Sequence, residues 1–310
     1  MRAELLARTR AFFAAQGFLE VETPLLSADT VVDRHVDPLS VILPHDSRSS
    51  DVGRKLWLQT SPEFAMKRLM AAGGQAIYQI TRAFRAGEAG ALHNQEFTIV
   101  EWYRRGDTMA EGMRLLSDLA EALLALGPAE CTSYAAAFKS HALIDPHRST
   151  PAELAALARR RGISVSESLA ASDRDGWLNL LLAHLVEPNL GHARPTVLYD
   201  YPASQAALAA VHGEEPVAKR FELYVRGVEL ANGYEELVDS DVLRERNRTA
   251  NAQRIADGKP RLPEASRLLA AMDHGLPACT GVAVGFDRVV MLAAGARSLA
   301  EVLAFPSDRA

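Results

Sequence analysis

The stretch Phe221–Leu237, which reads FELYVRGVELANGYEEL, most constrains the fold because it predicts a β-hairpin that carries several carboxylates. The expected strands are Phe221–Val225 and Val228–Leu237. They join at Arg226–Gly227, where glycine is free to take a positive φ. The rest of the chain must therefore supply a sheet that accepts this hairpin.

Two carboxylates of this hairpin are predicted to share one face. The turn pairs Tyr224 with Glu229 and places Glu222 diagonally from Glu229, roughly 7–8 Å away. Carboxylates at that separation repel each other unless a cation lies between them, and Mg²⁺ carried in on phosphates suits the position. The alternative is a solvated acidic strand at a sheet edge.

Asn232, Tyr234 and Glu236 alternate along the second strand and share a face. A strict period of two puts them opposite Glu229. A bulge at Gly233, or just before it, would bring both sets to one side, and glycine suits a bulge.

Composition narrows the class of protein. A chain of 310 residues with 48% hydrophobic content can bury a large core, as one domain or one domain with an insertion. The net charge of −5 gives no electrostatic footprint for non-specific nucleic-acid binding. Cys131 and Cys279 lack metal-ligand spacing, and no segment reads as a signal peptide or membrane span. We expect a cytoplasmic protein with reduced thiols and no membrane association.

Helical and strand patterns follow one another without strict alternation, which favours an α+β fold with a mainly antiparallel sheet carrying helices. Ser61 is expected to cap a helix with Pro62 at its first position, running to about Ala72. Leu143–Leu190 reads as a helical insertion. Other predicted strands are Phe18–Glu22, Ala76–Arg85, Glu96–Arg104, Thr196–Tyr201 and Gly281–Phe286.

One predicted strand presents Phe97, Ile99, Glu101 and Tyr103 on a single face. The acid and the phenol could together hold an ammonium group, and Phe97 could stack on a flat ring. Ordinary strand alternation with a structural Glu is the alternative. Glu63, in the first turn of its helix, is either a partner of the helix dipole or a ligand.

Two further groups suit phosphate. Arg85 ends a strand and His93 follows eight residues later, so an Arg fork and an imidazole lie at the mouth of a hairpin. Gly281, Gly285 and Arg288 form a strand–helix junction where a backbone can approach a ligand and the arginine can reach a triphosphate. Close helix–strand packing is the alternative there.

Taken together, these segments resemble the class II aminoacyl-tRNA synthetase family. Gln16–Leu26 resembles its first motif, Phe84–Arg85 with His93–Phe97 its second, and Gly281–Arg288 its third. The resemblance implies a class II catalytic core with a six-stranded, mainly antiparallel sheet flanked by helices.

Within that family the chain resembles the truncated lysyl-tRNA synthetase paralogues that modify bacterial translation elongation factor P. The segments that carry this resemblance read TSPE, HNQEFTIVEWYR, VEPNLG, YPASQAALA and GVELANGYEEL. The first motif begins within twenty residues of Met1, which leaves no room for an anticodon-binding domain. We therefore expect one catalytic domain over 1–310, with a helical insertion at about 143–190.

The resemblance implies ATP-dependent activation of (R)-β-lysine, or lysine, and transfer to a lysine side chain of elongation factor P. ATP and Mg²⁺ are the implied cofactors. A homodimer formed through the first motif is implied, and tRNA is not expected as a partner.

The resemblance also implies roles for individual residues. Arg85 and Arg288 would be catalytic, and Glu222 and Glu229 would hold the metal. The residues implied in ATP binding are Arg85, Glu88, His93, Asn94, Phe97, Glu222, Glu229 and Arg288. The residues implied in substrate binding are Ser61, Glu63, Glu101, Tyr103, Asn232, Tyr234, Glu236, Ala283 and Gly285.

The chain departs from the synthetase pattern at several positions. Gly87 occupies the place of the motif glutamate and Glu88 follows it, while Gln95 replaces a proline. Ala283 replaces the middle glycine of the third motif, and Ser61 replaces an alanine. The last two changes fit a substrate with a displaced amino group.

Two alternatives stay open. One is an ATP-dependent ligase of the same fold with a small-molecule acceptor, against which the ammonium clamp counts. The other is a catalytically silent synthetase paralogue.

Overall fold

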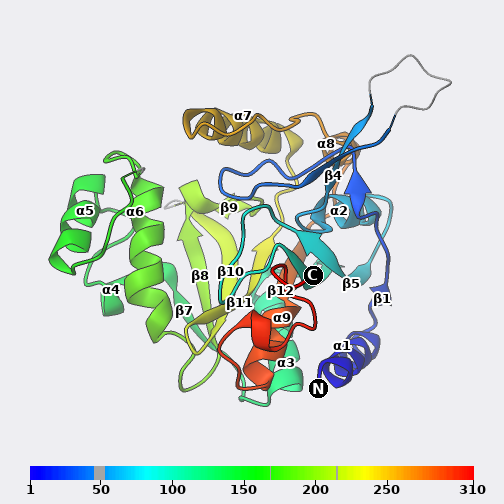
Figure 1. Ribbon diagram of the computed structural model, residues 1–310, viewed down its shortest axis with the longest axis horizontal. Helices are drawn as coiled ribbons and strands as arrows, with labels where there is room; N and C mark the ends of the chain where they lie inside the picture. The colour runs from blue at the N-terminus through cyan, green and yellow to red at the C-terminus, as the bar shows by residue number, and fades with distance from the viewer. Residues whose placement is uncertain (45–52, 168, 214–215) are drawn as a thin grey trace. The chain divides into compact units, whose positions relative to one another are not determined.

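The computed structural model describes residues 1–44, 53–167, 169–213 and 216–310 (Figure 1). The chain forms two compact units. The first unit comprises Met1–Thr108, Ala122–Leu124 and Glu236–Ala310, and the second comprises Met109–Glu121 and Ala125–Glu235.

The first unit contains four strands of the main sheet in the order β1-β5-β6-β12. Their bounds are β1 Leu19–Glu20, β5 Ala76–Phe84, β6 Glu96–Arg105 and β12 Cys279–Gly285. β1 pairs with β5 in parallel, and the pairs β5–β6 and β6–β12 are antiparallel. A small antiparallel sheet adds β2 (Leu26–Ser27), β4 (Lys55–Leu58) and β3 (Ser40–Ile42).

The helices of the first unit are α1 Arg2–Ala15, α2 Glu63–Ala71, α7 Ser240–Ala256, α8 Arg267–Met272 and α9 Phe286–Ala293. α1 contributes Phe13, which is fully buried and stacks on Tyr78 with ring centroids 4.4 Å apart. α2 starts one residue later than expected, with Pro62 as its N-cap. Ser61 still supports that start, because its hydroxyl accepts a hydrogen bond from the Glu63 N–H.

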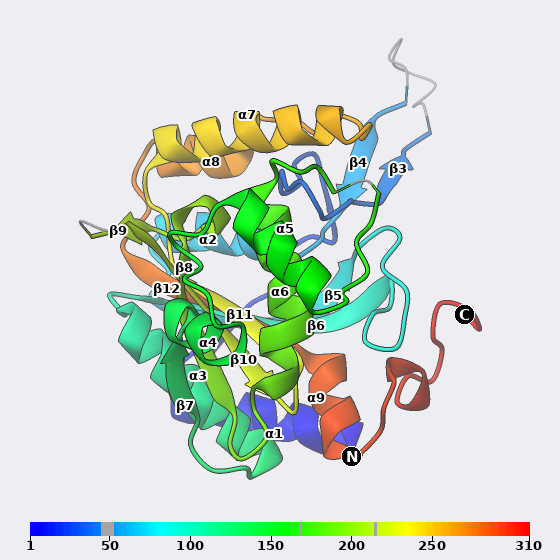
Figure 2. The ribbon, with the colours of Figure 1, turned by 90° about the vertical axis from the view of Figure 1, so that its left-hand side faces the viewer.

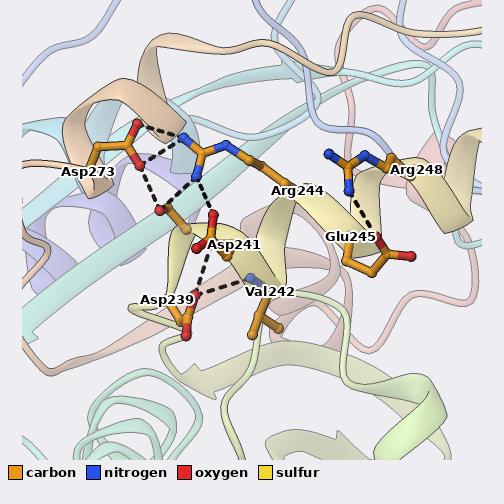
Figure 3. Close-up of polar contacts among 8 residues, drawn as sticks. Asp239, Asp241, Val242, Arg244, Glu245, Arg248 and Asp273 are labelled. Atoms are coloured by element: carbon orange, nitrogen blue, oxygen red, sulfur yellow. Dashed lines mark hydrogen bonds and ion pairs between the residues drawn. The ribbon is translucent and has the colours of Figure 1, made fainter.

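α7 and α8 lie next to each other in the first unit (Figure 2). Asp239 caps α7 by accepting hydrogen bonds from the N–H groups of Asp241 and Val242. Arg244 of α7 pairs with Asp241 at 2.8 Å and with Asp273, at the end of α8, at 2.6 Å (Figure 3). The ion pair therefore joins the start of one helix to the end of the other.

The second unit contains five strands in the order β11-β10-β8-β7, with β9 paired to β10. Their bounds are β11 Val228–Glu235, β10 Val217–Val225, β8 Thr196–Pro202, β7 Glu130–Ser133 and β9 Val211–His212. β7 and β8 are parallel, and the other pairings are antiparallel.

Helices accompany these strands, and a hydrophobic core that includes Tyr134, Phe138, Leu178 and Tyr201 fills the second unit. The helical elements are α3 Met109–Leu124, α4 Tyr134–His141, α5 Pro151–Arg160, α6 Arg174–Leu181, a π-helix at Leu182–Val186 and 3₁₀ turns at Glu187–Asn189 and Ala203–Gln205. α5 and α6 confirm the helical stretches expected between 143 and 190.

The α+β class is confirmed, but the six-stranded sheet is wrong. Over the described ranges the main-sheet strands number nine, four in the first unit and five in the second, and the parallel pairs β1–β5 and β7–β8 make the pairing mixed. β1 and β9 contain two residues each, too few to produce a periodic pattern in the sequence. Within the described residues, no helix combines the length and the apolar character needed to cross a membrane.

Candidate active site

Three carboxylates gather in the first unit, and the sequence had marked all of them. Glu101 lies on β6 and is 1% exposed, and Glu63 begins α2. Glu236 is 3% exposed, and its N–H donates to the Cys279 carbonyl at the start of β12. Burying several acids together is costly, so such a cluster requires hydrogen bonds and cations.

Two hydroxyl groups satisfy Glu101. The Tyr103 hydroxyl donates to its Oε1 at 2.7 Å, and the Ser61 hydroxyl donates to its Oε2 at 3.0 Å. Ser61, one of the departures from the synthetase pattern, thus contacts a predicted ammonium-binding carboxylate directly. An alanine at this position would remove that hydrogen bond.

A buried lysine joins the other two carboxylates. Lys67 follows Glu63 by one helical turn, and its side chain is 2% exposed. Its Nζ lies 2.6 Å from Glu63 Oε1 and 2.5 Å from Glu236 Oε2. The cluster therefore contains its own cation, held by two carboxylates that the sequence had assigned to a substrate.

The electrostatics of the cluster are dominated by burial. Lost hydration, reinforced by repulsion from Glu63, raises the pKa of Glu101 to about 8 against the hydrogen bonds of Tyr103 and Ser61. Burial likewise raises the pKa of Glu236 to about 8, although the Lys67 ammonium opposes the change.

Burial alone would lower the pKa of Lys67, but Glu236 and Glu63 outweigh it and raise that pKa above its usual value. The lysine is thus a cation at neutral pH, while Glu101 and Glu236 retain protons that a cationic ligand would displace.

β12 supplies the wall beside these groups. Gly281 and Ala283 pair with Tyr103 and Glu101 and so lie on the same face of the sheet. A Cβ on Gly281 would lie 2.2 Å from Tyr103 Cε1 and 2.3 Å from Glu236 Oε1. Glycine at this position is what allows the phenol and the carboxylate to approach the strand.

Arg85 and Phe97 form a second group at the other end of β6. The Arg85 guanidinium carbon lies 5.0 Å from the centre of the Phe97 ring, and Arg85 Nη1 lies 3.8 Å from Glu88 Oε1. Gly87 has a φ of +76°, a conformation that would strain a glutamate. Glu88, the next residue, forms an ion pair with Arg85.

His93 and Arg288, to which the family resemblance assigns the distal phosphates, contact each other. Arg288 Nη2 donates to His93 Nε2 at 2.8 Å, and Arg288 Nε donates to the Leu92 carbonyl. Burial and the charges of Arg288 and Arg85 lower the pKa of His93, so its imidazole is neutral. Both groups reach the same point from the β5–β6 loop and from α9.

Asn94 is engaged with the C-terminal segment. Its amide donates to the Glu96 carbonyl at 2.6 Å, and its oxygen accepts from the N–H and hydroxyl of Ser307. Gly285, another predicted site residue, is the N-cap of α9 and thereby sets the position of Arg288.

In the second unit the hairpin turn is confirmed. Arg226 and Gly227 have φ values of 52° and 74°, and Tyr224 pairs with Glu229. Positive φ at both central residues is typical of a tight two-residue turn that matches the twist of the strands.

The bulge lies elsewhere than expected. The register shifts between Leu223 and Tyr224, which leaves Leu230 as the extra residue of β11, so the prediction of a bulge at or just before Gly233 is wrong. The expected consequence holds, because Asn232 now faces Glu222 across the strands while Glu229 faces Tyr224. Tyr234 pairs with Arg220 in the same register.

Glu222 is held by a buried network in this unit. Arg220 donates to its Oε1 at 2.5 Å, and the hydroxyls of Tyr201 and Tyr224 donate to its Oε2 at 2.5 and 2.6 Å. Burial and the Glu222 charge raise the pKa of both tyrosines well above the usual value, so they remain donors.

These oxygens fit a magnesium ion brought in by phosphates. Glu222 and Glu229 lie on one face, and the buried Asn232 Oδ1 accepts no hydrogen bond. Mg²⁺ is typically bound through one or two carboxylates plus substrate phosphates and water. In the part of the chain that the structure describes, no group of three or more His, Cys, Asp or Glu side chains is arranged to hold a metal ion. The donor set therefore suits a substrate-borne ion rather than a permanent one.

Two cations of these clusters, Lys67 and Arg220, are not among the residues predicted from the sequence. Lys67 stands four residues after Glu63, a spacing at which helical side chains meet, and this signal was available. Arg220 stands two residues before Glu222 and so shares its strand face. Each missed cation balances a carboxylate that had been considered only as a ligand.

Comparisons with known proteins identify the family. A family model described as tRNA synthetases class II (D, K and N) matches residues 1–309. A protein of Klebsiella pneumoniae subsp. pneumoniae named elongation factor P–(R)-β-lysine ligase is 46% identical over 310 residues, which is 100% of this chain and 94% of the relative. Proteins of the same name from Salmonella paratyphi B and Salmonella schwarzengrund are 45% identical with the same coverage. The chain belongs to the class II tRNA synthetase family.

Proposed function

We propose that the protein activates (R)-β-lysine, or lysine, with ATP and transfers it to a lysine side chain of translation elongation factor P. The name shared by the full-length relatives supports this function. The observation that carries it is the cluster of Glu63, Glu101 and Glu236, because buried carboxylates in this number suit a ligand with ammonium groups.

The ammonium clamp has named parts in this proposal. Glu101, Tyr103 and Glu236 bind the distal ammonium, and Glu63 binds the second amino group. Ser61 fixes the Glu101 carboxylate through its hydrogen bond. Ala283 and Gly285 shape the pocket wall, since Ala283 pairs with Glu101 in the sheet.

The nucleotide has its own set of groups. Phe97 stacks on adenine, Arg85 binds the α-phosphate and the substrate carboxylate, and His93 and Arg288 hold the distal phosphates. The contact of Arg288 with a neutral His93 supports this role, because it presents a cation and a hydrogen-bonding ring together. Glu88 and Asn94 order the loop around them.

The hairpin of the second unit has its own proposed roles. Glu222 and Glu229 would hold Mg²⁺, which would neutralise phosphate charge, and Asn232 with Tyr234 would contact the amino-acid substrate. Arg220 and two tyrosine hydroxyls hold the Glu222 carboxylate in one orientation.

The chemistry requires no protein nucleophile. A carboxylate oxygen of the amino acid attacks the α-phosphorus, the bond to the β-phosphate oxygen breaks, and pyrophosphate leaves. An acceptor amine then attacks the aminoacyl-adenylate carbonyl, loses a proton and displaces AMP. Arg85 and Arg288 act by positioning the groups and by stabilising charge on the phosphates.

We further propose that 1–310 acts as one catalytic domain, as a cytoplasmic homodimer and without tRNA. The mass of elongation factor P tests the acceptor. Incubation of the protein with ATP, (R)-β-lysine and elongation factor P should increase the factor's intact mass by one lysyl group. The matched control is a factor whose acceptor lysine is changed to arginine, and its mass should stay the same. An unchanged mass of the wild-type factor after incubation would contradict the proposed acceptor.

A further inference from the structure

We propose that Lys67 is a positioning residue for substrate binding, which sets the charge that the pocket presents. Its buried ammonium fixes Glu63 and Glu236 and balances one of the three carboxylates, leaving two negative charges for a substrate with two ammonium groups. This inference rests on the proposed function and deepens it by naming why diamino acids are selected.

The geometry distinguishes Lys67 from a surface lysine. Its side chain is 2% exposed and bridges two carboxylates that belong to α2 and to the segment before α7. Lys67 Nζ donates a hydrogen bond to Glu63 Oε1 and forms an ion pair with Glu236 Oε2. A lysine is rarely buried unless it is paired, and here each partner is itself a proposed substrate ligand.

The charge count follows from the residues present. Glu63, Glu101 and Glu236 carry three negative charges when ionised, and Lys67 carries one positive charge, so the net charge is minus two. Lysine and β-lysine each carry two ammonium groups, which the proposed function places at this cluster. At neutral pH Glu101 and Glu236 hold protons, and the exchange of these two protons for two ammonium groups keeps the buried cluster neutral, the state that a low-dielectric site favours.

Other titratable groups around the cluster do not alter this count. Burial, together with the negative charges nearby, raises the pKa of Cys279 to about 12 and that of Tyr103 well above its usual value, so both stay neutral. α8, which packs against α2, contributes only the exposed Arg267 among its ionisable side chains.

Lys67 also adjusts the other carboxylates. Its charge lowers the pKa of both Glu101 and Glu236, against the effect of burial. Without this charge, both acids would hold their protons to higher pH and would bind an ammonium less well at pH 7. The expected defect is therefore one of substrate binding that depends on pH, not a uniform loss of activity.

The test compares Lys67→Met with Lys67→Arg and with Arg68→Met, a matched control that removes an exposed cation from the next position of α2. ATP–pyrophosphate exchange is measured with L-lysine and (R)-β-lysine as a function of pH. Lys67→Met should raise the KM for the amino acid at least about tenfold at pH 7, with kcat within about threefold. The acid limb of its kcat/KM profile should move up by about one pH unit or more.

Lys67→Arg keeps the positive charge, so the acid limb of its kcat/KM profile should coincide with that of the wild type. The acid limb of Arg68→Met should coincide with it as well. An acid limb that stays in place in Lys67→Met, or that moves equally in Lys67→Arg, would overturn the inference. A merely structural lysine would lower activity at every pH without moving the limb.

Two further measurements keep the inference open to refutation. Lys67→Gln serves as a second neutral variant if Lys67→Met does not fold, with circular dichroism as the check. If both variants fail to fold, the inference is tested by the number of protons that the wild type releases when it binds L-lysine. The charge count of the cluster predicts about two protons, and the release of none or of three would contradict it. Wild-type protein that shows no exchange with either amino acid would instead refute the proposed function.

Discussion

Binding of a lysine-type amino acid should release protons from the carboxylate cluster. Burial raises the pKa of Glu101 and Glu236 to about 8, whereas an ammonium ligand needs both carboxylates ionised. A group with a pKa of about 8 is about 90% protonated at pH 7. Binding that ionises both groups should therefore release about two protons at pH 7.

The same displacement makes the affinity depend on pH. Each acid must lose its proton before it binds an ammonium, so the affinity should fall about tenfold per pH unit for each released proton below about pH 7. Above about pH 8 both acids are ionised before the ligand arrives, and the dependence should level off. The raised pKa thus predicts tighter binding as the pH rises through about 8.

Isothermal titration calorimetry of L-lysine in two buffers of different ionisation enthalpy measures the protons released. Glu245→Gln, which removes an exposed carboxylate of α7 paired with Arg248, is the control and should leave the number unchanged (Figure 3). Equal heats in both buffers, with an affinity that is flat from about pH 6 to about pH 8, would refute the reasoning.

Three substitutions test other contacts. Glu236→Gln should lower kcat/KM for lysine-type substrates about 100-fold or more with the fold intact, because it removes one partner of a buried charge pair; undiminished exchange would exclude the clamp. Gly281→Ala should raise the KM for the amino acid while leaving that for ATP within about twofold, because the new Cβ meets Tyr103 and overpacking typically costs about 1–3 kcal/mol; equal effects on both substrates would contradict this. Asp287→Asn should lower the free energy of unfolding by about 1–3 kcal/mol in urea titrations, because Asp287 pairs with Arg2 at 2.6 Å and accepts from a β6 N–H; an unchanged midpoint would show that the contact does not contribute.

The local parts of the site could be predicted from the sequence because their signals are local. The turn at Arg226–Gly227 and the pairing of Tyr224 with Glu229 could be predicted from Gly227, which is free to take a positive φ. The shared face of Glu101 and Tyr103 needs only the period of a strand. The contact of His93 with Arg288 could be inferred only through the family resemblance, since 195 residues separate them.

The parts that the sequence did not predict depend on the details of strand pairing and on contacts between distant segments. The bulge at Leu230 is set by how β10 and β11 pair, and the sequence around Gly233 offered a residue that tolerates a bulge without requiring one. The nine strands include two-residue strands with no period to detect. Lys67 was missed because its partner Glu236 is 169 residues away, although its spacing from Glu63 was visible.

ATP–pyrophosphate exchange with (R)-β-lysine, L-lysine and L-aspartate tests the central claim most directly. Exchange with the two lysines and none with aspartate is the predicted result, because the cluster of Glu63, Glu101 and Glu236 accepts cations and repels a carboxylate side chain. Exchange driven by aspartate, or no exchange with any of the three amino acids, would contradict the account.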